Sequence, residues 1–346
     1  MKHLISVVIP CYNSEPYLKT CLDSVLRQTW PHWECIVVDD GSTDASAALA
    51  ADYAATDPRI RVVTIAHAGV SYAVARGVEE AAGQWLYFLD SDDWIDPNEL
   101  ERLYRTVTDN SCDMICSDFI IEEESGSNLR SIVRFQGVVE QENFPKVFYP
   151  HLLCNTRYSG LVCGNTRSGK LVRREMALRH ISCQLGMTFA EDALLMLNIL
   201  LDCQRVYGDA GRSGYHYRMH GQSSMHNYGF SLAALRIDYA HRLRQLFDSR
   251  GIAGIPALEG NYCQYLLYCV LATVRQVGGK FSELKKSQPE IYGWFADTVR
   301  SIPVFRGSHL PLRDRAVLIL LRLRLYRLLC LLYDINHFIR YKPKGV

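Results

Sequence analysis

The sequence LISVVIPCYNSEPYLKTCLDSVL (residues 4–26) joins a strand pattern to a helix pattern. Leu4–Ile9 is a continuous apolar run, which is typical of a strand buried on both faces of a sheet. Ser14 is suited to cap a helix, and apolar residues at helical spacing follow it: Leu18, Leu22, Val25 and Leu26. The stretch therefore predicts a strand, a polar loop and a helix, the first unit of an alternating α/β fold.

The same alternation continues to about residue 110. Further strands are predicted at residues 34–38, 60–65 and 84–89, and further helices at 44–55 and 70–82. A fourth helix is expected to be capped by Asp96, with Pro97 at its first position. This order predicts an α/β fold with a mostly parallel sheet and helices on both faces.

Polar residues follow three of the predicted strands, at Pro10–Asn13, Asp39–Ser42 and Asp90–Asp93. Ligands of open parallel sheets bind outside the carboxyl ends of the strands. Each cluster alone also fits ordinary turn chemistry, because Asp, Asn, Gly and Ser are common turn residues. Three clusters on one edge of one sheet favour a binding site.

The third cluster crowds the carboxylates of Asp90, Asp92 and Asp93, which repel one another unless a positive charge is present. Mg²⁺ and Mn²⁺ prefer oxygen ligands and commonly combine one or two carboxylates with substrate phosphate. Asp90 and Asp92 are therefore the candidate ligands of a divalent cation. No G-x-G-x-x-G follows the first strand, so a dehydrogenase is disfavoured.

A second phosphate motif is incomplete. The segment Gly164–Lys170 matches the first seven positions of a P-loop, but Leu171 stands where Ser or Thr should hold Mg²⁺. The segment also comes after the β-α alternation has ended. An ATPase is therefore not favoured.

Composition and charge limit the partners and the compartment. The chain has 346 residues, 48% of them hydrophobic, and a net charge of +1, which predicts a sizeable core and no nucleic-acid partner. The apolar run at the N-terminus is too short for a signal peptide, and no apolar run reaches the ~20 residues of a membrane-spanning helix. Twelve cysteines without a CxxC pair predict reduced thiols in a cytoplasmic protein.

Taken together, the motifs resemble those of family-2 glycosyltransferases, which have the GT-A fold. The resemblance covers about residues 3–225 and rests on these segments: Pro10–Asn13, Gln28-Thr29, Asp39–Ser42, Ala75-Arg76, Asp90–Asp93, Lys170–Glu175, Glu191-Asp192 and Tyr215–Arg218. It implies transfer of a sugar from a nucleotide-diphosphate donor, expected to be UDP-linked, to an acceptor hydroxyl with inversion. It also implies a place in bacterial surface-polysaccharide synthesis, with a saccharide or lipid-linked saccharide as acceptor.

The resemblance assigns roles to individual residues. Those implied to bind the nucleotide-sugar are Pro10, Tyr12, Asn13, Asp39, Asp40, Arg76, Asp90 and Ser91. Pro10 and Tyr12 are implied to contact the base, and Asp40 to accept a hydrogen bond from uracil. Asp39 is expected to orient its loop. Asp92, with Asp90, is implied to hold Mn²⁺ or Mg²⁺, and Asp93 stays open as an alternative ligand.

Asp192 is implied to be the general base that takes the proton of the acceptor hydroxyl. Such a base typically contributes ~10²–10⁴-fold to the rate. An alternative interpretation stays open, because Glu191 and Asp192 precede an apolar helix and negative charge favours a helix N-terminus.

Two other functions also stay open. A sugar-nucleotide nucleotidyltransferase would be expected to carry a Gly-rich basic loop near the N-terminus. Residues 10–20 contain a single basic residue, Lys19, and no Gly. A non-catalytic nucleotide-sugar-binding protein would be expected to lack some of Asp40, Asp92 and Asp192, which are all present.

The sequence predicts a catalytic domain at 1–225 and a helical region at 226–346. Within the first, residues 1–110 are expected to bind the nucleotide and residues 111–225 the acceptor. A Leu-rich helix predicted at 313–333 carries Arg322, Arg324 and Arg327 on different sides. Two interpretations stay open: peripheral contact of 313–344 with the inner face of the cytoplasmic membrane, or packing as a core or dimer helix.

Overall fold

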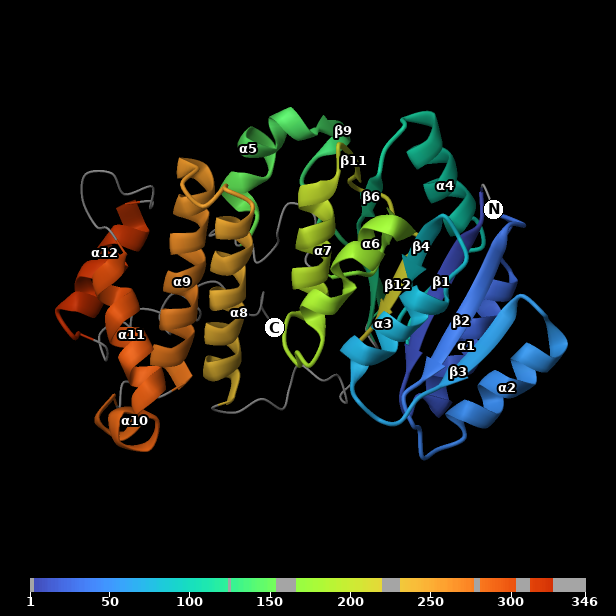
Figure 1. Cartoon of the computed structure of the whole chain (residues 1–346), viewed down its shortest axis with the longest axis horizontal. Coiled ribbons are helices and arrows are strands. Elements are labelled where there is room, and N and C mark those ends of the chain that lie inside the picture. The colour runs from blue at the N-terminus through green and yellow to red at the C-terminus, as the bar shows by residue number, and fades with distance from the viewer. Residues whose placement is uncertain are drawn as a thin grey trace, which may run out of the picture. The chain divides into compact units, whose positions relative to one another are not determined.

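A large mixed sheet forms the centre of the first half of the protein (Figure 1). The computed structural model describes residues 3–123, 126–153, 166–219, 231–276, 281–302 and 312–325. Within these ranges an eight-stranded sheet has the order β3-β2-β1-β4-β10-β6-β11-β9. Its strands are β1 (Ile5–Cys11), β2 (Trp33–Asp39), β3 (Ile60–Thr64), β4 (Trp85–Phe88), β6 (Met114–Ser117), β9 (Gln136–Glu140), β10 (Lys170–Arg173) and β11 (Arg205–Asp209).

The neighbouring strands β3, β2, β1 and β4 are parallel. They are connected by α1 (Glu15–Leu26), α2 (Ser46–Thr56) and α3 (Val70–Glu80), so the predicted β-α alternation is confirmed. Strands β2 and β4 lie on opposite sides of β1, which makes the β1–β4 boundary a topological switch point. Ligands of open α/β sheets bind at the carboxyl ends of the strands beside such a point.

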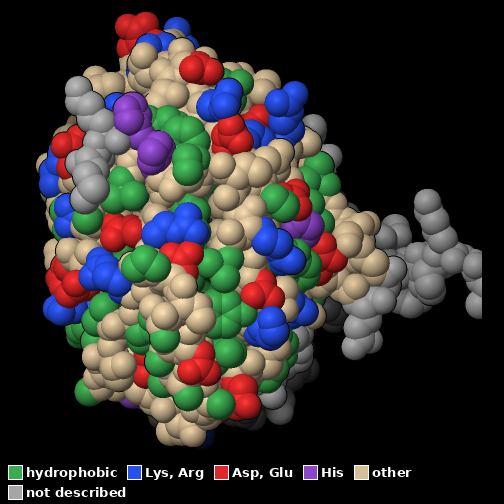
Figure 2. Space-filling view, turned by 90° about the vertical axis from the view of Figure 1, so that its right-hand side faces the viewer, with side chains coloured by type: hydrophobic (Ala, Val, Ile, Leu, Met, Phe, Trp, Pro, Cys, Tyr) green, Lys and Arg blue, Asp and Glu red, His purple; other side chains and the backbone are tan. Residues whose placement is uncertain are grey.

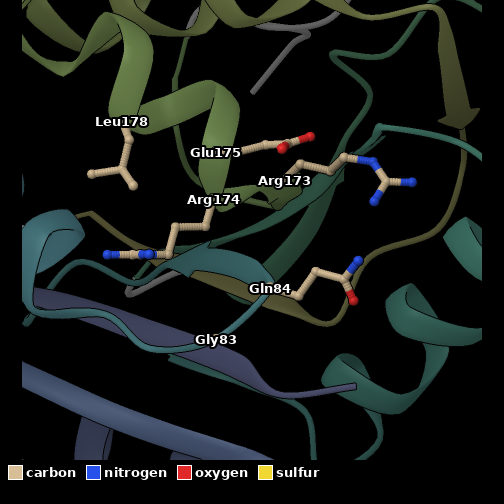
Figure 3. A pocket seen from close by; sticks show the side chains of 6 residues that line it. All are labelled: Gly83, Gln84, Arg173, Arg174, Glu175 and Leu178. Atoms are coloured by element: carbon tan, nitrogen blue, oxygen red, sulfur yellow. The ribbon is translucent and has the colours of Figure 1, made fainter. Parts of the chain in front are cut away.

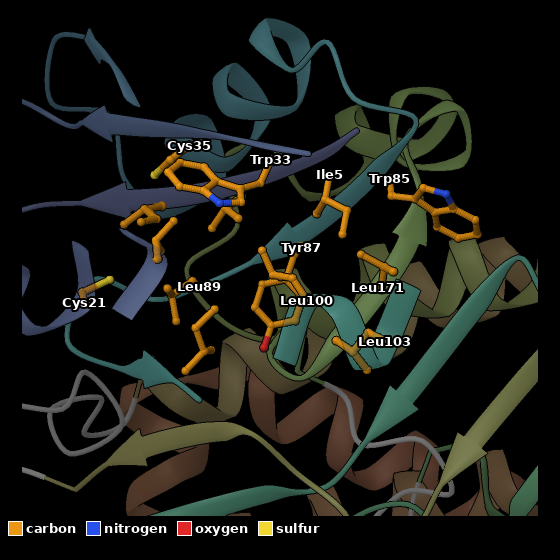
Figure 4. Close-up of a cluster of buried hydrophobic side chains, with 14 of the residues drawn as sticks. Ile5, Cys21, Trp33, Cys35, Trp85, Tyr87, Leu89, Leu100, Leu103 and Leu171 are labelled. Atoms are coloured by element: carbon orange, nitrogen blue, oxygen red, sulfur yellow. The ribbon is translucent and has the colours of Figure 1, made fainter. Parts of the chain in front are cut away.

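One face of the sheet packs against α1 and α4 (Glu99–Asp109). Alternate side chains of the strands point to this face, because side chains alternate along a strand. The resulting core is fully buried and includes the following residues, drawn in Figure 4: Ile5, Cys21, Trp33, Cys35, Trp85, Tyr87, Leu89, Leu100, Leu103 and Leu171.

The other face of the sheet is covered by α3. A Cβ atom on Gly77 of this helix would lie 2.3 Å from Val8 Cγ1 and 3.3 Å from Val38 Cγ2. Only glycine therefore lets α3 approach β1 and β2 this closely. Helices thus lie on both faces of the sheet, as the sequence predicts.

Strand β10 runs antiparallel to both of its neighbours in the large sheet, β4 on one side and β6 on the other. A smaller sheet with the order β5-β12-β7-β8 forms beside it from β5 (Trp94–Ile95), β7 (Phe119–Glu123), β8 (Gly126–Arg130) and β12 (Tyr215–Arg218). Two helices complete this part of the chain, α6 (Arg174–His180) and α7 (Glu191–Asp202).

The predicted cap of the fourth helix is wrong. Helix α4 begins at Glu99, with Asn98 at the N-cap position. The Asp96 carboxylate instead lies 3.2 Å from Nε2 of His216. Ser14 does occupy the N-cap position of α1, but its hydroxyl contacts Ser91 and the carbonyl of Tyr12 rather than the helix backbone.

The chain divides into two compact units. The first comprises residues 1–144 and 160–224, and the second comprises residues 145–159 and 225–346. The second unit is helical and contains α8 (Ser231–Ser249), α9 (Pro256–Gln276), α10 (Phe281–Ser287), α11 (Pro289–Ser301) and α12 (Leu312–Arg322). Helix α5 (Phe144–Val147) lies at the boundary in the sequence.

The Leu-rich helix ends earlier than the sequence predicts. Helix α12 stops at Arg322, and Arg324 has a left-handed φ of 58°. Leu318 and Leu321 are buried against α11, and Arg322 donates to the carbonyls of three residues at the end of α11 (Val299, Arg300 and Ile302). The described part is therefore packed in the second unit. The rest of the predicted helix, with Arg327, lies outside the described residues.

None of the described helices combines the length and apolar character needed to cross a membrane. On the face shown in Figure 2, basic and acidic side chains are interspersed rather than gathered into one large patch of a single sign.

Candidate functional site

The three polar clusters meet at one edge of the sheet. Cys11 pairs with Asp39 at the ends of β1 and β2, and the N–H of Leu89 donates to the carbonyl of Val8 just before Asp90. The Oγ atoms of Ser14 and Ser91 lie 2.7 Å apart and link the first cluster to the third. Segments up to 80 residues apart in the sequence therefore form one surface.

The first and second clusters are joined through Asn13. Its backbone has a φ of 49°, in the left-handed region, and its side-chain Oδ1 accepts the N–H of Thr43 at 2.8 Å. Its own N–H donates to the Oγ of Ser42. Asp39 is buried and accepts the N–H of Ser42 at 3.2 Å. Asn13 and Asp39 thus fix the loop.

Asp40 is buried and holds the loop that follows β3. Its carboxylate accepts the N–H groups of Ala68 at 2.8 Å and Gly69 at 2.9 Å, and it lies 2.9 Å from Nδ1 of His67. The His67 ring also stacks on Tyr12, whose side chain is 45% exposed. An exposed aromatic ring after β1 and a buried carboxylate after β2 therefore both contact His67.

Asp90 is already paired with a cation. Its Oδ1 accepts a hydrogen bond from Nη2 of Arg167 at 2.8 Å, and its Oδ2 accepts one from the hydroxyl of Ser168 at 3.3 Å. Both partners lie in the segment that resembles an incomplete P-loop. The sequence reveals no role for Arg167, because its position beside Asp90 depends on β10 inserting antiparallel next to β4.

Asp92 and Asp93 have different surroundings. Asp93 is fully buried, and its carboxylate accepts the hydroxyl of Tyr215 at 2.6 Å and the N–H of Arg218 at 2.8 Å. Burial, with the charges of Asp90 and Asp92, raises the pKa of Asp93 well above its usual value. Asp92 is only half-buried. The geometry therefore favours Asp92 over Asp93 as the residue that meets a cation.

The Glu191-Asp192 pair lies at the start of α7. Ala190, just before it, has a φ of 55°, a conformation that costs a non-glycine residue about 1–3 kcal/mol. The Asp192 carboxylate accepts the N–H of Ala193 at 2.7 Å. Burial and the neighbouring Glu191 charge raise the pKa of Asp192 to about 7, while Arg167 opposes this rise.

That pKa has a chemical consequence. A carboxylate with a pKa near 7 can accept a proton and release it again close to neutral pH, as a general base must. Arg167 connects the Asp90 side of the site to Glu191, the residue before Asp192, because its Nη1 lies 3.7 Å from Oε1 of Glu191. The contact with Ala193 shows that Asp192 also serves the helix N-terminus, so the two interpretations of this residue are compatible.

Arg76 is not brought to the carboxylates by any contact in the described part of the chain. Its guanidinium pairs with Glu80 at 2.5 Å, four residues along α3, and its side chain is 46% exposed. The residues that do join the clusters and that sequence reasoning missed are His67, Arg167 and Ser168.

A pocket of about 360 Å³ lies elsewhere, where β4 begins (Figure 3). Its lining residues are Gly83, Gln84, Arg173, Arg174, Glu175 and Leu178. Gln84 precedes β4 and Asp90 follows it, so this pocket and the polar clusters lie at opposite ends of the strand. We do not assign the pocket to the candidate site.

The carboxylates fit a divalent cation only in part. Among the described residues, no group of three His, Cys, Asp or Glu side chains could hold a metal ion. Asp90 and Asp92 offer oxygen ligands, although Arg167 and Ser168 already engage Asp90. Two carboxylates are only a partial oxygen set, which Mn²⁺ and Mg²⁺ commonly complete with phosphate and water.

Comparisons with known proteins agree with this arrangement. The family model described as glycosyl transferase family 2 matches residues 6–180. The chain is 32% identical to the putative glycosyltransferase EpsH of Bacillus subtilis (strain 168) over 227 residues, which is 65% of this chain and 63% of EpsH. It is 29% identical over 345 residues to the uncharacterized glycosyltransferase EpsJ of the same organism, covering 96% of both.

Among solved structures, the chain is similar to residues 1–349 of TarS from S. aureus in complex with UDP-GlcNAc. The TM-score is 0.69 at 18% identity, and the match covers 97% of this chain and 92% of the TarS chain. At this identity the likeness concerns the fold, and it confirms the expected fold class.

Proposed function

Because the chain belongs to glycosyl transferase family 2, we propose that it transfers a sugar from a UDP-linked donor to an acceptor hydroxyl with inversion. The acceptor is a saccharide or a lipid-linked saccharide, and the product belongs to a cell-surface polysaccharide. The single observation that carries this proposal is the meeting of Tyr12, Asp40 and Asp90 at the carboxyl edge of the sheet, with the Glu191-Asp192 pair joined to Asp90 through the contact of Arg167 with Glu191.

The nucleoside binds at the ends of β1 and β2. The exposed ring of Tyr12 offers a face for the base. Pro10, two residues earlier in the chain, lies in β1, and its backbone also contacts the base. The buried Asp40 carboxylate accepts an N–H from the base, which suits N3–H of uracil. The likeness of the fold to that of TarS, solved with UDP-GlcNAc, supports a uridine donor.

The diphosphate lies beside the third cluster. Asp92, with Asp90, would hold Mn²⁺ or Mg²⁺, and Asp90 and Ser91 would face the ribose. When bound, the ion offsets the charge that develops on the leaving diphosphate. Asp93 has a structural role, because it is fully buried and both of its oxygens accept hydrogen bonds.

Inversion requires the acceptor oxygen to attack from the side of the sugar opposite the diphosphate. A base must therefore lie on that side. Asp192 suits this role because it comes from α7, a segment separate from the β4 loop, and because its pKa of about 7 allows proton transfer near neutrality.

Membrane contact is a finer part of the proposal. The last turn of α12 and the residues just after it leave three apolar side chains on the surface, with Ile319 38%, Leu323 63% and Leu325 42% exposed. Such a strip beside Arg324 suits shallow insertion among anionic headgroups at the inner face of the cytoplasmic membrane. It would bring the enzyme close to a lipid-linked acceptor.

A panel of nucleotide sugars tests the function. The full chain is incubated with each donor, with and without Mn²⁺, and donor hydrolysis and thermal stabilisation are measured. We expect a UDP-sugar to give the largest metal-dependent response. Indifference to all donors, with and without metal, would contradict the proposal.

A further inference from the structure

Arg167 connects two parts of the candidate site that come from different elements. Its Nη2 donates to Oδ1 of Asp90, which follows β4, at 2.8 Å. Its Nη1 lies 3.7 Å from Oε1 of Glu191, which begins α7. Its side chain is only 8% exposed. One buried guanidinium thus spans the donor-side carboxylate and the pair that contains the proposed base.

Burying a guanidinium is unfavourable unless opposite charges surround it. Here the surrounding charges are those of Asp90, Asp192 and Glu191. The Nε of Arg167 has no hydrogen-bond partner among the described residues, so the carboxylates rather than a complete set of hydrogen bonds hold the side chain. The position is therefore defined by the functional carboxylates.

We propose that Arg167 is a positioning residue that holds the Glu191-Asp192 pair against the donor side of the site through its contacts with Asp90 and Glu191. The inference rests on the proposed function, because it requires Asp192 to act as the base. Arg167 acts through Asp192 and need not touch the substrate. Its guanidinium stays protonated throughout the working range of pH.

The electrostatic surroundings of Asp192 support this role. Burial, Glu191 and Asp90 raise its pKa, whereas Arg167 and the N–H of Ala193 lower it. Arg167 is the cation in this group. Its removal should raise the pKa of Asp192 further, so that a smaller fraction of the base is ionised at neutral pH.

The test compares three variants of the full chain over a range of about pH 5.5–9.5. Arg167→Met removes the charge, and Arg167→Lys keeps it but cannot bridge two carboxylates as a guanidinium does. Arg173→Met is the matched control, because Arg173 pairs with Asp113 at 2.8 Å at the other end of the same strand, β10. The readouts are kcat, the KM for the donor and UDP binding.

We expect Arg167→Met to move the acidic limb of kcat/KM upward by about one pH unit, which is about a tenfold loss below neutral pH. Arg167→Lys should keep the limb in place while kcat falls several-fold. Arg173→Met should keep both the limb and kcat.

Three outcomes would overturn the inference. The first is a pH profile and a kcat of Arg167→Met that both match the parent. The second is a loss of UDP binding by Arg167→Met with an unchanged pH profile, which would make Arg167 a diphosphate ligand. The third applies if Arg167→Met does not fold. Arg167→Lys is then the test, and a kcat equal to that of the parent would overturn the inference. If Asp192→Asn stays active, the proposed function fails instead, so the two failures are distinguishable.

Discussion

The imidazole ring of His67 stacks on the phenol ring of Tyr12, with the ring centroids 4.2 Å apart and the planes 21° from parallel. Its Nδ1 also lies 2.9 Å from Oδ2 of Asp40. A uracil bound as proposed would make the same two contacts, one with the face of Tyr12 and one with Asp40. His67 therefore competes with the base for these two residues.

Replacing His67 with Ala should tighten UDP binding about three- to tenfold, because a stacked aromatic pair contributes about 0.5–1.5 kcal/mol. Tyr12→Ala should weaken it about tenfold, because the stacking face for the base is lost. Isothermal titration with UDP measures both. Weaker binding by His67→Ala would show instead that His67 forms a second wall for the base.

Asp192→Asn should abolish transfer while leaving the donor bound. The amide cannot take the acceptor proton, so kcat should fall by about 10²–10⁴-fold. The Kd for UDP should stay within about twofold of the parent value, because we propose that Asp192 faces the acceptor and not the nucleotide. Asp23→Asn, on the outer part of α1, is a suitable control because Asp23 pairs with Lys19 and Tyr53 away from the site. Transfer by Asp192→Asn at the parent rate would require another base.

The rate of transfer should depend on the ionisation of Asp192. Its pKa of about 7 predicts that kcat/KM rises with pH, reaches half its plateau near that pH and falls about tenfold per pH unit below it. Because this pKa is raised above the ordinary value of 3.8, the folded state retains a proton that the unfolded chain releases. The free energy of unfolding should therefore decrease as the pH rises between these two values.

Thermal melts of the parent and Asp192→Asn at several pH values check the second part. Asp192→Asn should be more stable than the parent above neutral pH, because it removes a partly buried charge that lies beside Glu191. Equal melting temperatures at all pH values would contradict the raised pKa.

Asp92 and Asp93 should separate in a metal titration. Asp92→Asn should weaken Mn²⁺-dependent donor binding at least tenfold, because it removes a charged oxygen ligand. Asp93→Asn should lower the stability by about 1–3 kcal/mol, because it disturbs the buried contacts with Tyr215 and Arg218, and should leave the metal dependence unchanged. The reverse pattern would make Asp93 the ligand.

The exposed apolar strip at the end of α12 and just after it (Ile319, Leu323 and Leu325) should control membrane binding. The double variant Ile319→Glu with Leu323→Glu should reduce co-sedimentation with anionic vesicles, while Leu318 and Leu321 keep the helix packed. Tyr268→Glu is the control, because it places the same charge on an exposed side chain of α9. Unchanged co-sedimentation of the double variant would count against interfacial contact.

The sequence alone was sufficient for the parallel α/β half of the fold. The buried strands are mostly apolar, and their helices carry apolar residues at helical spacing, so local patterns and short connections determine this part. The same logic predicts that Tyr12, Asp40 and Asp90 share an edge, because the carboxyl ends of parallel strands meet there. The prediction that Asp96 caps the fourth helix is wrong because the Asp96 carboxylate has a tertiary partner, His216.

Only the tertiary structure places Arg167 beside Asp90 and Glu191, and His67 in contact with both Tyr12 and Asp40. Strand β10 inserts antiparallel between β4 and β6, and no local pattern in the sequence specifies a long-range insertion of this kind. The raised pKa of Asp192 has the same origin. It depends on burial and on charges from three separate segments, which come together only when the chain is folded.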